Sequence, residues 1–168
     1  MCASRRRRGF SLVEILISIV LVGLSITALV MASNSLTMAN GAGADLSTAE
    51  FLIEQIRELT TMLPAADPEA SAWTVLGPEA GETLSSYDDV DDLNGFNSAS
   101  LSGPINAAKT VLTDFSSFTQ QVIVQKVNPS NLDHAEDDTY DSPFLRVTVT
   151  IVQNGKQISS ASWIRAKY

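Results

Sequence analysis

The chain has 168 residues, enough for one domain, and carries 11 basic against 19 acidic residues, a formal net charge of −8. Four of the basic residues form one cluster, Arg5 to Arg8, so the rest of the chain has 7 basic and 19 acidic residues, a net charge of −12. This acidic body excludes a nucleic-acid-binding surface, which would be basic. The single cysteine, Cys2, and the single histidine, His134, exclude an intrachain disulfide, a cysteine-ligated zinc site and any site that needs two histidines.

A long apolar segment follows the arginine cluster. From Phe10 to Ala32 the chain has 23 residues with one charge, Glu14, and no proline. A helix of that length spans about 35 Å, and a bilayer core needs ~20 apolar residues. The arginines on the N-terminal side of this segment predict a cytoplasmic N-terminus, with the acidic body on the other side of the membrane.

Three interpretations of this segment compete. A secretory signal peptide has a shorter apolar region, of ~7–15 residues, and a small-residue cleavage site that Val30 to Ala32 matches only loosely. An ordinary membrane anchor leaves Glu14 unexplained, because a carboxylate in hydrocarbon costs roughly 2.5–3.5 kcal/mol and is usually functional. The third interpretation accounts for both the length of the segment and its glutamate.

Residues 8 to 14, which read Arg-Gly-Phe-Ser-Leu-Val-Glu, resemble the N-terminus of type IV prepilins and pseudopilins. In that family a basic leader ends in glycine, and a prepilin peptidase cuts after the glycine and methylates the new N-terminal residue. The resemblance implies cleavage between Gly9 and Phe10, N-methylation of Phe10, and a glutamate, Glu14, as the fifth residue of the mature chain. The motif is specific because the leader, the glycine, the aromatic residue and the glutamate must coincide at fixed spacing.

The resemblance implies a structural protein rather than an enzyme: a minor pilin or pseudopilin of a type IV pilus or a type II secretion pseudopilus. Such a subunit spans the bacterial inner membrane once, with a periplasmic body, before it enters the pilus or pseudopilus. Its implied partners are the prepilin peptidase, other pilins or pseudopilins, the inner-membrane assembly platform and the lipid bilayer. Two alternatives remain: a membrane-anchored periplasmic binding or sensing module, and a hydrolase, for which we find no nucleophile and base.

The resemblance also implies a role for Glu14. Cleavage would leave a positively charged amine on Phe10, four residues before the carboxylate of Glu14. In a bundle of parallel helices with a low local dielectric, such a pair would be strong enough to set the register of neighbouring subunits. We therefore expect Glu14 to act in assembly, and the alternative is neutralisation of the same chain's own helix N-terminus.

The predicted organisation begins with a cleaved leader, residues 1–9, and an N-terminal helix, residues 10–63, of which 10–32 are transmembrane. Gly41 and Gly43 predict a bend or soft spot rather than a full stop, since each glycine costs about 1 kcal/mol in a helix. An amphipathic stripe then continues until Pro64, which ends the helix. The stripe consists of Ala49, Leu52, Ile53, Ile56, Leu59 and Leu63.

The second half of the chain predicts an irregular loop region and then a sheet. Residues 64–117 lack periodicity, with a short strand possible at 73–76, and residues 118–168 predict an antiparallel sheet with a C-terminal hairpin. Strand signals lie at 119–127 and 145–151, and Asn154-Gly155 is a strong hairpin signal. The predicted fold class is α+β, a long helix packed on a three- to four-stranded antiparallel sheet, and the pilin-like fold implied by the resemblance agrees with it.

The hairpin signal also predicts a register. With Asn154-Gly155 as a two-residue turn, the inward-facing pairs are Leu145–Ile164, Val147–Ser162, Val149–Ser160 and Ile151–Ile158. The serines would form a shallow bed for the helix. On the outer face, Arg146 would lie opposite Trp163 and form a cation–π pair.

An acidic stretch lies within the predicted loop region, at residues 87–96. It holds four candidate calcium ligands, Asp88, Asp89, Asp91 and Asp92, although EF-hand spacing fails because Val90 stands where the first aspartate should be. We prefer an acidic turn bent at Asn94-Gly95, so no cofactor or metal is expected, and calcium is the alternative. The stretch also resembles minor pilins of the mannose-sensitive haemagglutinin type.

Overall fold

The computed structural model describes residues 9–65 and 75–167. Most of the predicted leader, residues 1–8, lies outside this part. The possible strand at 73–76 is described only at residues 75 and 76, which form no strand. The chain divides into two compact units, Met1–Ala44 and Asp45–Tyr168. Helix α1 (Leu12–Met62) contributes residues to both units.

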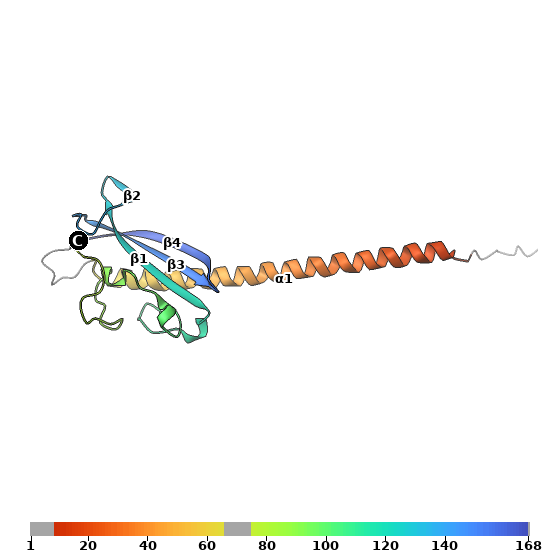
Figure 1. The fold of residues 1–168 in the computed structure, drawn as a ribbon, viewed down its shortest axis with the longest axis horizontal. Coiled ribbons are helices and arrows are strands. Elements are labelled where there is room, and N and C mark those ends of the chain that lie inside the picture. The colour runs from red at the N-terminus through yellow and green to blue at the C-terminus, as the bar shows by residue number, and fades with distance from the viewer. Residues whose placement is uncertain (1–8, 66–74, 168) are drawn as a thin grey trace, which may run out of the picture. The chain divides into compact units, whose positions relative to one another are not determined.

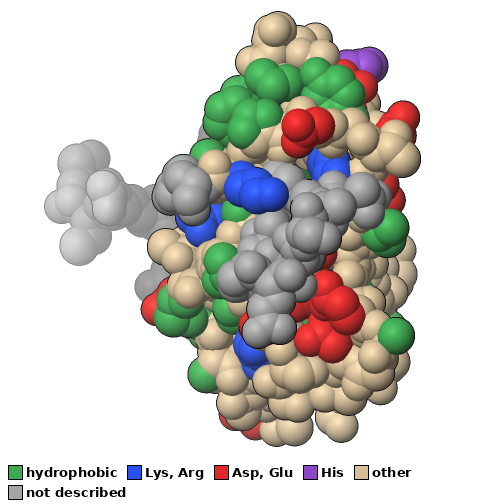
Figure 2. Space-filling view, turned by 90° about the vertical axis from the view of Figure 1, so that its left-hand side faces the viewer, with side chains coloured by type: hydrophobic (Ala, Val, Ile, Leu, Met, Phe, Trp, Pro, Cys, Tyr) green, Lys and Arg blue, Asp and Glu red, His purple; other side chains and the backbone are tan. Residues whose placement is uncertain are grey.

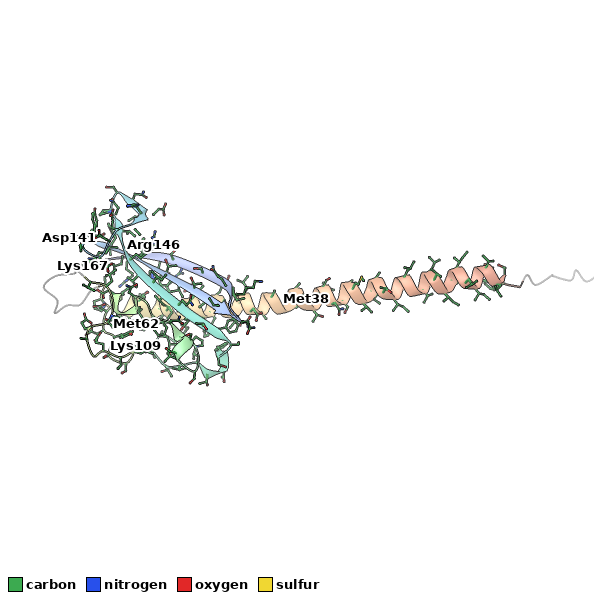
Figure 3. All side chains as sticks on the ribbon, viewed as in Figure 1. Met38, Met62, Lys109, Asp141, Arg146 and Lys167 are labelled. Atoms are coloured by element: carbon green, nitrogen blue, oxygen red, sulfur yellow. The ribbon has the colours of Figure 1, made fainter. Side chains whose placement is uncertain are left out.

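The first unit contains the N-terminal part of α1. The helix begins at Leu12 because Ser11 caps it: the Ser11 Oγ accepts a hydrogen bond from the Glu14 N–H at 3.2 Å. Helical structure continues through Gly41 and Gly43, so the glycines do not end the helix. Every described residue from 9 to 44 is exposed, and apolar side chains project from this stretch on all sides (Figure 3). Such a segment is long and apolar enough to cross a membrane.

The hydroxyl side chains of this apolar stretch are bonded within the helix. Ser18, Ser25 and Thr27 donate to the carbonyl oxygens four residues earlier, at 2.7, 2.8 and 2.9 Å. A polar group in hydrocarbon is costly unless it has an internal partner, and these bonds supply one. Among described residues 12–32, the carboxylate of Glu14 is the polar side-chain group that has no such bond.

The second unit is an antiparallel sheet packed on the C-terminal part of α1 (Figure 1), which confirms the predicted α+β class. Its strands are β1 (Phe118–Asn128), β2 (Asn131–Ala135), β3 (Phe144–Gln153) and β4 (Lys156–Ala166), in the order β2-β1-β3-β4. Between α1 and β1 the described chain contains three short 3-10 helices: η1 (Asp91–Leu93), η2 (Ser98–Ser100) and η3 (Thr113–Phe115).

The core of this unit lies between α1 and one face of the sheet. The predicted stripe on the helix is confirmed, since five of its members are buried and Leu63 packs beside them. The alternating residues of β1 and β3 that face the helix are buried as well. The buried helix residues are Ala49, Leu52, Ile53, Ile56 and Leu59, and the buried strand residues include Val122, Val124, Leu145, Val147, Val149 and Ile151.

The hairpin turn was predicted correctly, but the register beyond it was not. Asn154 and Gly155 form the turn with φ of 51° and 77°. A bulge between Ile151 and Val152 then shifts the pairing by one residue, so that Ile151 faces Ser159 and Val147 faces Trp163. Because side chains alternate between faces, this shift moves every later β4 residue to the opposite face.

Two expectations fail for this reason. Ser160 and Ser162 lie on the outer face rather than forming a bed for the helix. Trp163 lies on the inner face, so it does not stack on Arg146; instead the guanidinium of Arg57, on α1, lies 4.9 Å from the centre of the Trp163 ring. The Trp163 Nε1 also donates to Thr60 Oγ1 at 3.2 Å, so this side chain attaches the helix to β4.

The loop before the sheet covers the edge of β1. Gly95 N donates to Val122 O at 3.1 Å, and Val122 N donates to Phe96 O at 2.9 Å. Deeper in the unit, the buried amide of Gln120 donates to Leu52 O and Ile105 O, at 3.0 and 3.1 Å. The irregular segment that carries the acidic stretch is therefore anchored to both the strand and the helix.

Candidate functional site

The predicted cleavage point lies immediately before α1. Gly9 and Phe10 precede the helix, and 78% of the Phe10 surface is exposed. A Cβ atom added at Gly9 would meet no atom of the described residues within 4 Å. Any need for glycine at this position therefore comes from an external binding partner and not from the fold of the chain itself.

Ser11 and Glu14 together form the start of the helix. They occupy the first and fourth positions of a Ser-x-x-Glu capping sequence, and the Ser11 hydroxyl accepts the bond from Glu14 N that such a sequence predicts. The sequence analysis predicted a role in assembly for Glu14 but did not identify Ser11, which this capping pattern could have indicated. The Glu14 carboxylate is left free for another partner.

The acidic stretch forms a tight turn around two aspartates. Asp89 Oδ1 accepts hydrogen bonds from the N–H groups of Asp91 and Asp92, at 2.7 and 3.2 Å. Asp92 Oδ2 accepts in return from the N–H groups of Asp88 and Asp89, at 2.8 and 3.3 Å. The two carboxylates thus stabilise the backbone of η1 reciprocally, each through one of its oxygens.

The second oxygen of each carboxylate has no partner. Asp89 and Asp92 are both fully buried, and Asp89 Oδ2 and Asp92 Oδ1 are buried atoms without a hydrogen bond. Burying a carboxylate oxygen without a partner is costly, and native structures rarely leave one so. Asp92 is therefore the centre of an unsatisfied, negatively charged site.

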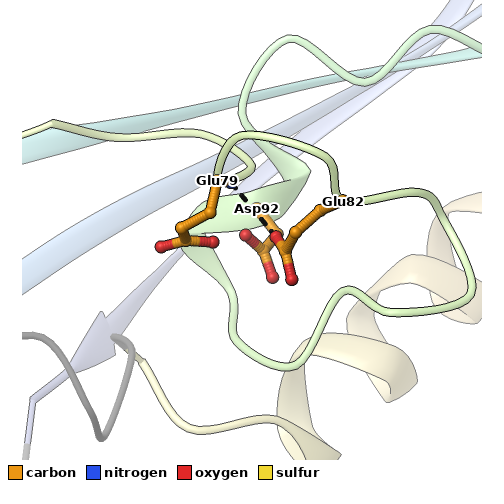
Figure 4. Close-up of side chains that lie close together, drawn as sticks. All are labelled: Glu79, Glu82 and Asp92. Carbon is orange, nitrogen blue, oxygen red and sulfur yellow. Dashed lines mark hydrogen bonds between the residues drawn. The ribbon is translucent and has the colours of Figure 1, made fainter.

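Two glutamates from an earlier turn approach the same aspartate. Carboxylate oxygens of Glu79, Glu82 and Asp92 lie within 4.8 Å of one another (Figure 4), as do those of Asp88, Asp89 and Asp92. Glu82 is held by a hydrogen bond from Glu79 N to its Oε2, at 3.1 Å. The sequence analysis did not identify either glutamate, because Glu79 and Glu82 stand 13 and 10 residues before Asp92 in a segment without periodicity.

Asp91, the fourth predicted candidate, lies outside both groups of carboxylates. Its Oδ1 accepts a hydrogen bond from Gly77 N at 3.2 Å. Its charge also acts on Lys126, a fully buried lysine of β1: burial lowers the pKa of Lys126, while the charges of Asp138 and Asp91 oppose that shift. The charge of Asp91 therefore acts on both Lys126 and Asp89, although its carboxylate is in neither group.

The crowding of negative charge raises two pKa values. Burial, followed by the charges of Asp91 and Asp92, raises the pKa of Asp89 to about 7. The side chain of Glu79, with smaller contributions from burial and Asp92, raises the pKa of Glu82 to about 7. Both shifts have the direction expected where carboxylates approach one another without a cation between them. Figure 2 shows acidic side chains gathered in a patch on one face of the molecule.

Comparison with family models identifies the N-terminal motif. Residues 4–30 match the prokaryotic N-terminal methylation motif, the type IV prepilin and pseudopilin signature, which confirms the resemblance over these residues. The motif supports a pilin- or pseudopilin-like precursor, implies processing by a prepilin peptidase and assembly with other pilins, and together with the apolar helix suggests membrane anchoring. Comparisons with curated proteins and with solved structures each gave no match.

Proposed function

We propose that this chain, which carries the type IV prepilin and pseudopilin signature, is a structural subunit of a type IV pilus or a type II secretion pseudopilus. A prepilin peptidase cuts it between Gly9 and Phe10 and methylates Phe10. The mature chain then spans the inner membrane once, with its body in the periplasm, until it enters the filament as a minor pilin or pseudopilin.

The observation that carries this proposal is the position of the motif relative to the helix. The motif covers residues 4–30, and α1 begins at Leu12, two residues after the expected new N-terminus. Cleavage after Gly9 would therefore leave the apolar helix intact, whereas a signal peptidase would remove it. A retained, fully exposed apolar helix needs other apolar surfaces around it, first lipid and then the helices of other subunits.

Glu14 supports the assembly part of the proposal. The hydroxyls between residues 12 and 32 are bonded inside the helix, whereas the carboxylate of Glu14 is not. The amine of Phe10 on a neighbouring subunit is the partner that cleavage would supply. Pairing of the two in a dry helix bundle would fix how far each new subunit slides along its neighbour.

Processing is tested by intact mass spectrometry of the chain produced together with a prepilin peptidase. We expect loss of residues 1–9 and the mass of one added methyl group on Phe10. Gly9→Val should leave the precursor uncut, because the branched side chain would block the close approach that glycine allows the peptidase.

The matched control is Gly23→Val, which makes the same change within the helix at a glycine that likewise has no atom within 4 Å of an added side chain. This variant should be cut as completely as the parent chain. A mature protein starting near Ser33 would contradict the pilin proposal and indicate a secreted protein. A full-length, uncut chain would instead favour the membrane-anchored binding or sensing module.

A further inference from the structure

We propose that the acidic turn between α1 and β1 is a calcium site centred on Asp92, with Asp88 and Asp89 on one side and Glu79 and Glu82 on the other. Cation binding at this turn requires neither cleavage nor assembly, so it goes beyond the structural role proposed above and is tested separately.

The two buried, unpartnered oxygens carry the proposal. Asp89 Oδ2 and Asp92 Oδ1 are buried and accept no hydrogen bond, although the other oxygen of each carboxylate accepts two. A cation bound to these free oxygens would satisfy both without disturbing the bonds that hold the turn. The backbone bonds thus hold the two aspartates in place before any ion binds, which lowers the ordering cost of binding.

Within the described residues, no positively charged side chain pairs with the carboxylates of the acidic turn. The salt bridges Arg57–Glu54 and His134–Glu136 lie elsewhere, and in residues 9–65 and 75–167 no lysine or arginine nitrogen pairs with any of the five carboxylates. Lys109, which is close in space, donates its ammonium group to the backbone oxygen of Tyr87. Within the described part of the chain, the negative charge at Asp92 is therefore not compensated by a lysine or arginine.

The chemistry of the donors selects calcium. All five are carboxylates, which are hard oxygen ligands, and calcium accepts 6–8 such ligands at about 2.3–2.6 Å in flexible geometry. Two ligand oxygens on opposite sides of a calcium ion are then about 5 Å apart. That spacing agrees with each group of three carboxylates around Asp92, within which the oxygens lie within 4.8 Å of one another. Magnesium needs a tighter octahedron at about 2.0–2.1 Å and fits this loose arrangement less well.

Burial differs across the site in a way that suits an ion arriving from solvent. Asp89 and Asp92 form a buried floor, Glu82 is half-buried, and Glu79 and Asp88 are exposed at the rim. An ion could therefore enter from the exposed side and reach the buried oxygens, while the rim carboxylates complete its coordination.

Thermal unfolding of the full chain in detergent micelles tests the proposal. With 10 mM CaCl2, about 100-fold above a Kd of ~10⁻⁴ M typical of extracellular calcium modules, the Tm should be roughly 5–10 °C higher than in EGTA. Magnesium chloride at the same concentration should give less than half that rise. A calcium effect no larger than that of magnesium would indicate charge screening and overturn the proposal.

Asp92→Asn isolates the site, because the amide oxygen can still accept the two backbone bonds while the charge is lost. Its Tm should exceed that of the parent chain in EGTA, since repulsion is relieved, and calcium should raise it by less than 2 °C. The matched control is Asp133→Asn, an exposed aspartate on β2 with the same change in charge, which should retain the full calcium effect. An equal calcium effect in Asp92→Asn and the parent would overturn the proposal.

Terbium luminescence gives a second readout that does not depend on unfolding. Tyr87 directly precedes Asp88 in the chain, and the charges of Asp92 and Glu82, together with burial, raise the pKa of its hydroxyl. Excitation of this ring should therefore sensitise terbium bound at the site, and calcium should displace the signal. Tyr87→Phe should lose most of the sensitised signal and keep its calcium-dependent Tm. Sensitised emission that persists in Asp92→Asn would place the ion elsewhere and contradict the proposal.

Discussion

At the scale of single residues, the backbone and the side chain of Glu14 have separate surroundings. Its backbone N–H completes the cap on Ser11, which any residue except proline could do, whereas its carboxylate makes no bond inside the helix. In hydrocarbon this charge costs roughly 2.5–3.5 kcal/mol on insertion scales. Replacing only the side chain therefore keeps the helix cap and removes the carboxylate that we propose acts in assembly.

Glu14→Leu is predicted to be processed and inserted as well as the parent chain, because Gly9 and Phe10 are unchanged and the segment becomes more apolar. It should fail to enter filaments, since the amine of a neighbouring Phe10 would then be buried without a partner, at a cost on the order of 3–5 kcal/mol. The measurement is the amount of the subunit in sheared filament fractions, which should fall at least 100-fold.

Glu50→Leu is the control for that experiment, because it makes the same change at an exposed position of the same helix, within the second unit. Its entry into filaments should match that of the parent chain. Normal incorporation of Glu14→Leu would mean that Glu14 only neutralises the N-terminus of its own chain, and the assembly role would be wrong.

At the scale of elements, Trp163 reports where β4 lies against α1. The bulge between Ile151 and Val152 places its ring on the inner face, under Arg57 and bonded to Thr60. In the register predicted from the sequence, the same ring would lie outside, opposite Arg146. The observed register therefore predicts that Trp163 interacts with Arg57, whereas the register predicted from the sequence pairs Trp163 with Arg146.

A double-mutant cycle distinguishes the two registers. Trp163→Ala should lower the free energy of unfolding by about 2–3 kcal/mol, because it leaves a cavity beside the helix, whereas Ile164→Ala on the exposed face should cost about 0.5 kcal/mol or less. The coupling energy with Arg57→Ala should be about 0.5–1 kcal/mol, and that with Arg146→Ala should be near zero. Denaturant unfolding supplies all these values, and a larger coupling to Arg146 would contradict the observed register.

The same hairpin shows why the sequence predicts some features of the fold and not others. Asn154 and Gly155 both have positive φ, so a local signal was enough to locate the turn. The bulge depends instead on how β4 packs against α1, and no local pattern of residues 156–166 records it. The helix stripe and the cleavage motif were predictable because they are local, whereas Glu79 and Glu82 join the acidic site only through the folding of an irregular loop.

At the scale of the whole molecule, stability is concentrated in one of the two units. Every described residue from 9 to 44 is exposed, and all buried apolar residues come from Ala49 or later. The unit Asp45–Tyr168 therefore contains the entire described core, although its helix is only the last third of α1.

A fragment of residues 45–168 is accordingly predicted to fold on its own and to stay in solution without detergent. Its free energy of unfolding should match that of the full chain within about 0.5 kcal/mol, because the removed residues bury nothing in the described structure. Guanidinium unfolding and the near-ultraviolet circular dichroism of the two tryptophans, Trp73 and Trp163, are the measurements. Aggregation, or loss of the tryptophan signal, would show that the first unit supports the second.

The order of elements along the chain has a consequence for biosynthesis. The helix face that forms half of the core is made first, and its partner Trp163 follows Thr60 by 103 residues. At ~5–20 residues per second, a ribosome takes roughly 5–20 s to cover that distance. Until β1 and β3 have been made, within this interval, the apolar face of the nascent helix has no strand to pack against. We therefore expect this face to be shielded during that time, by a chaperone or at the membrane surface.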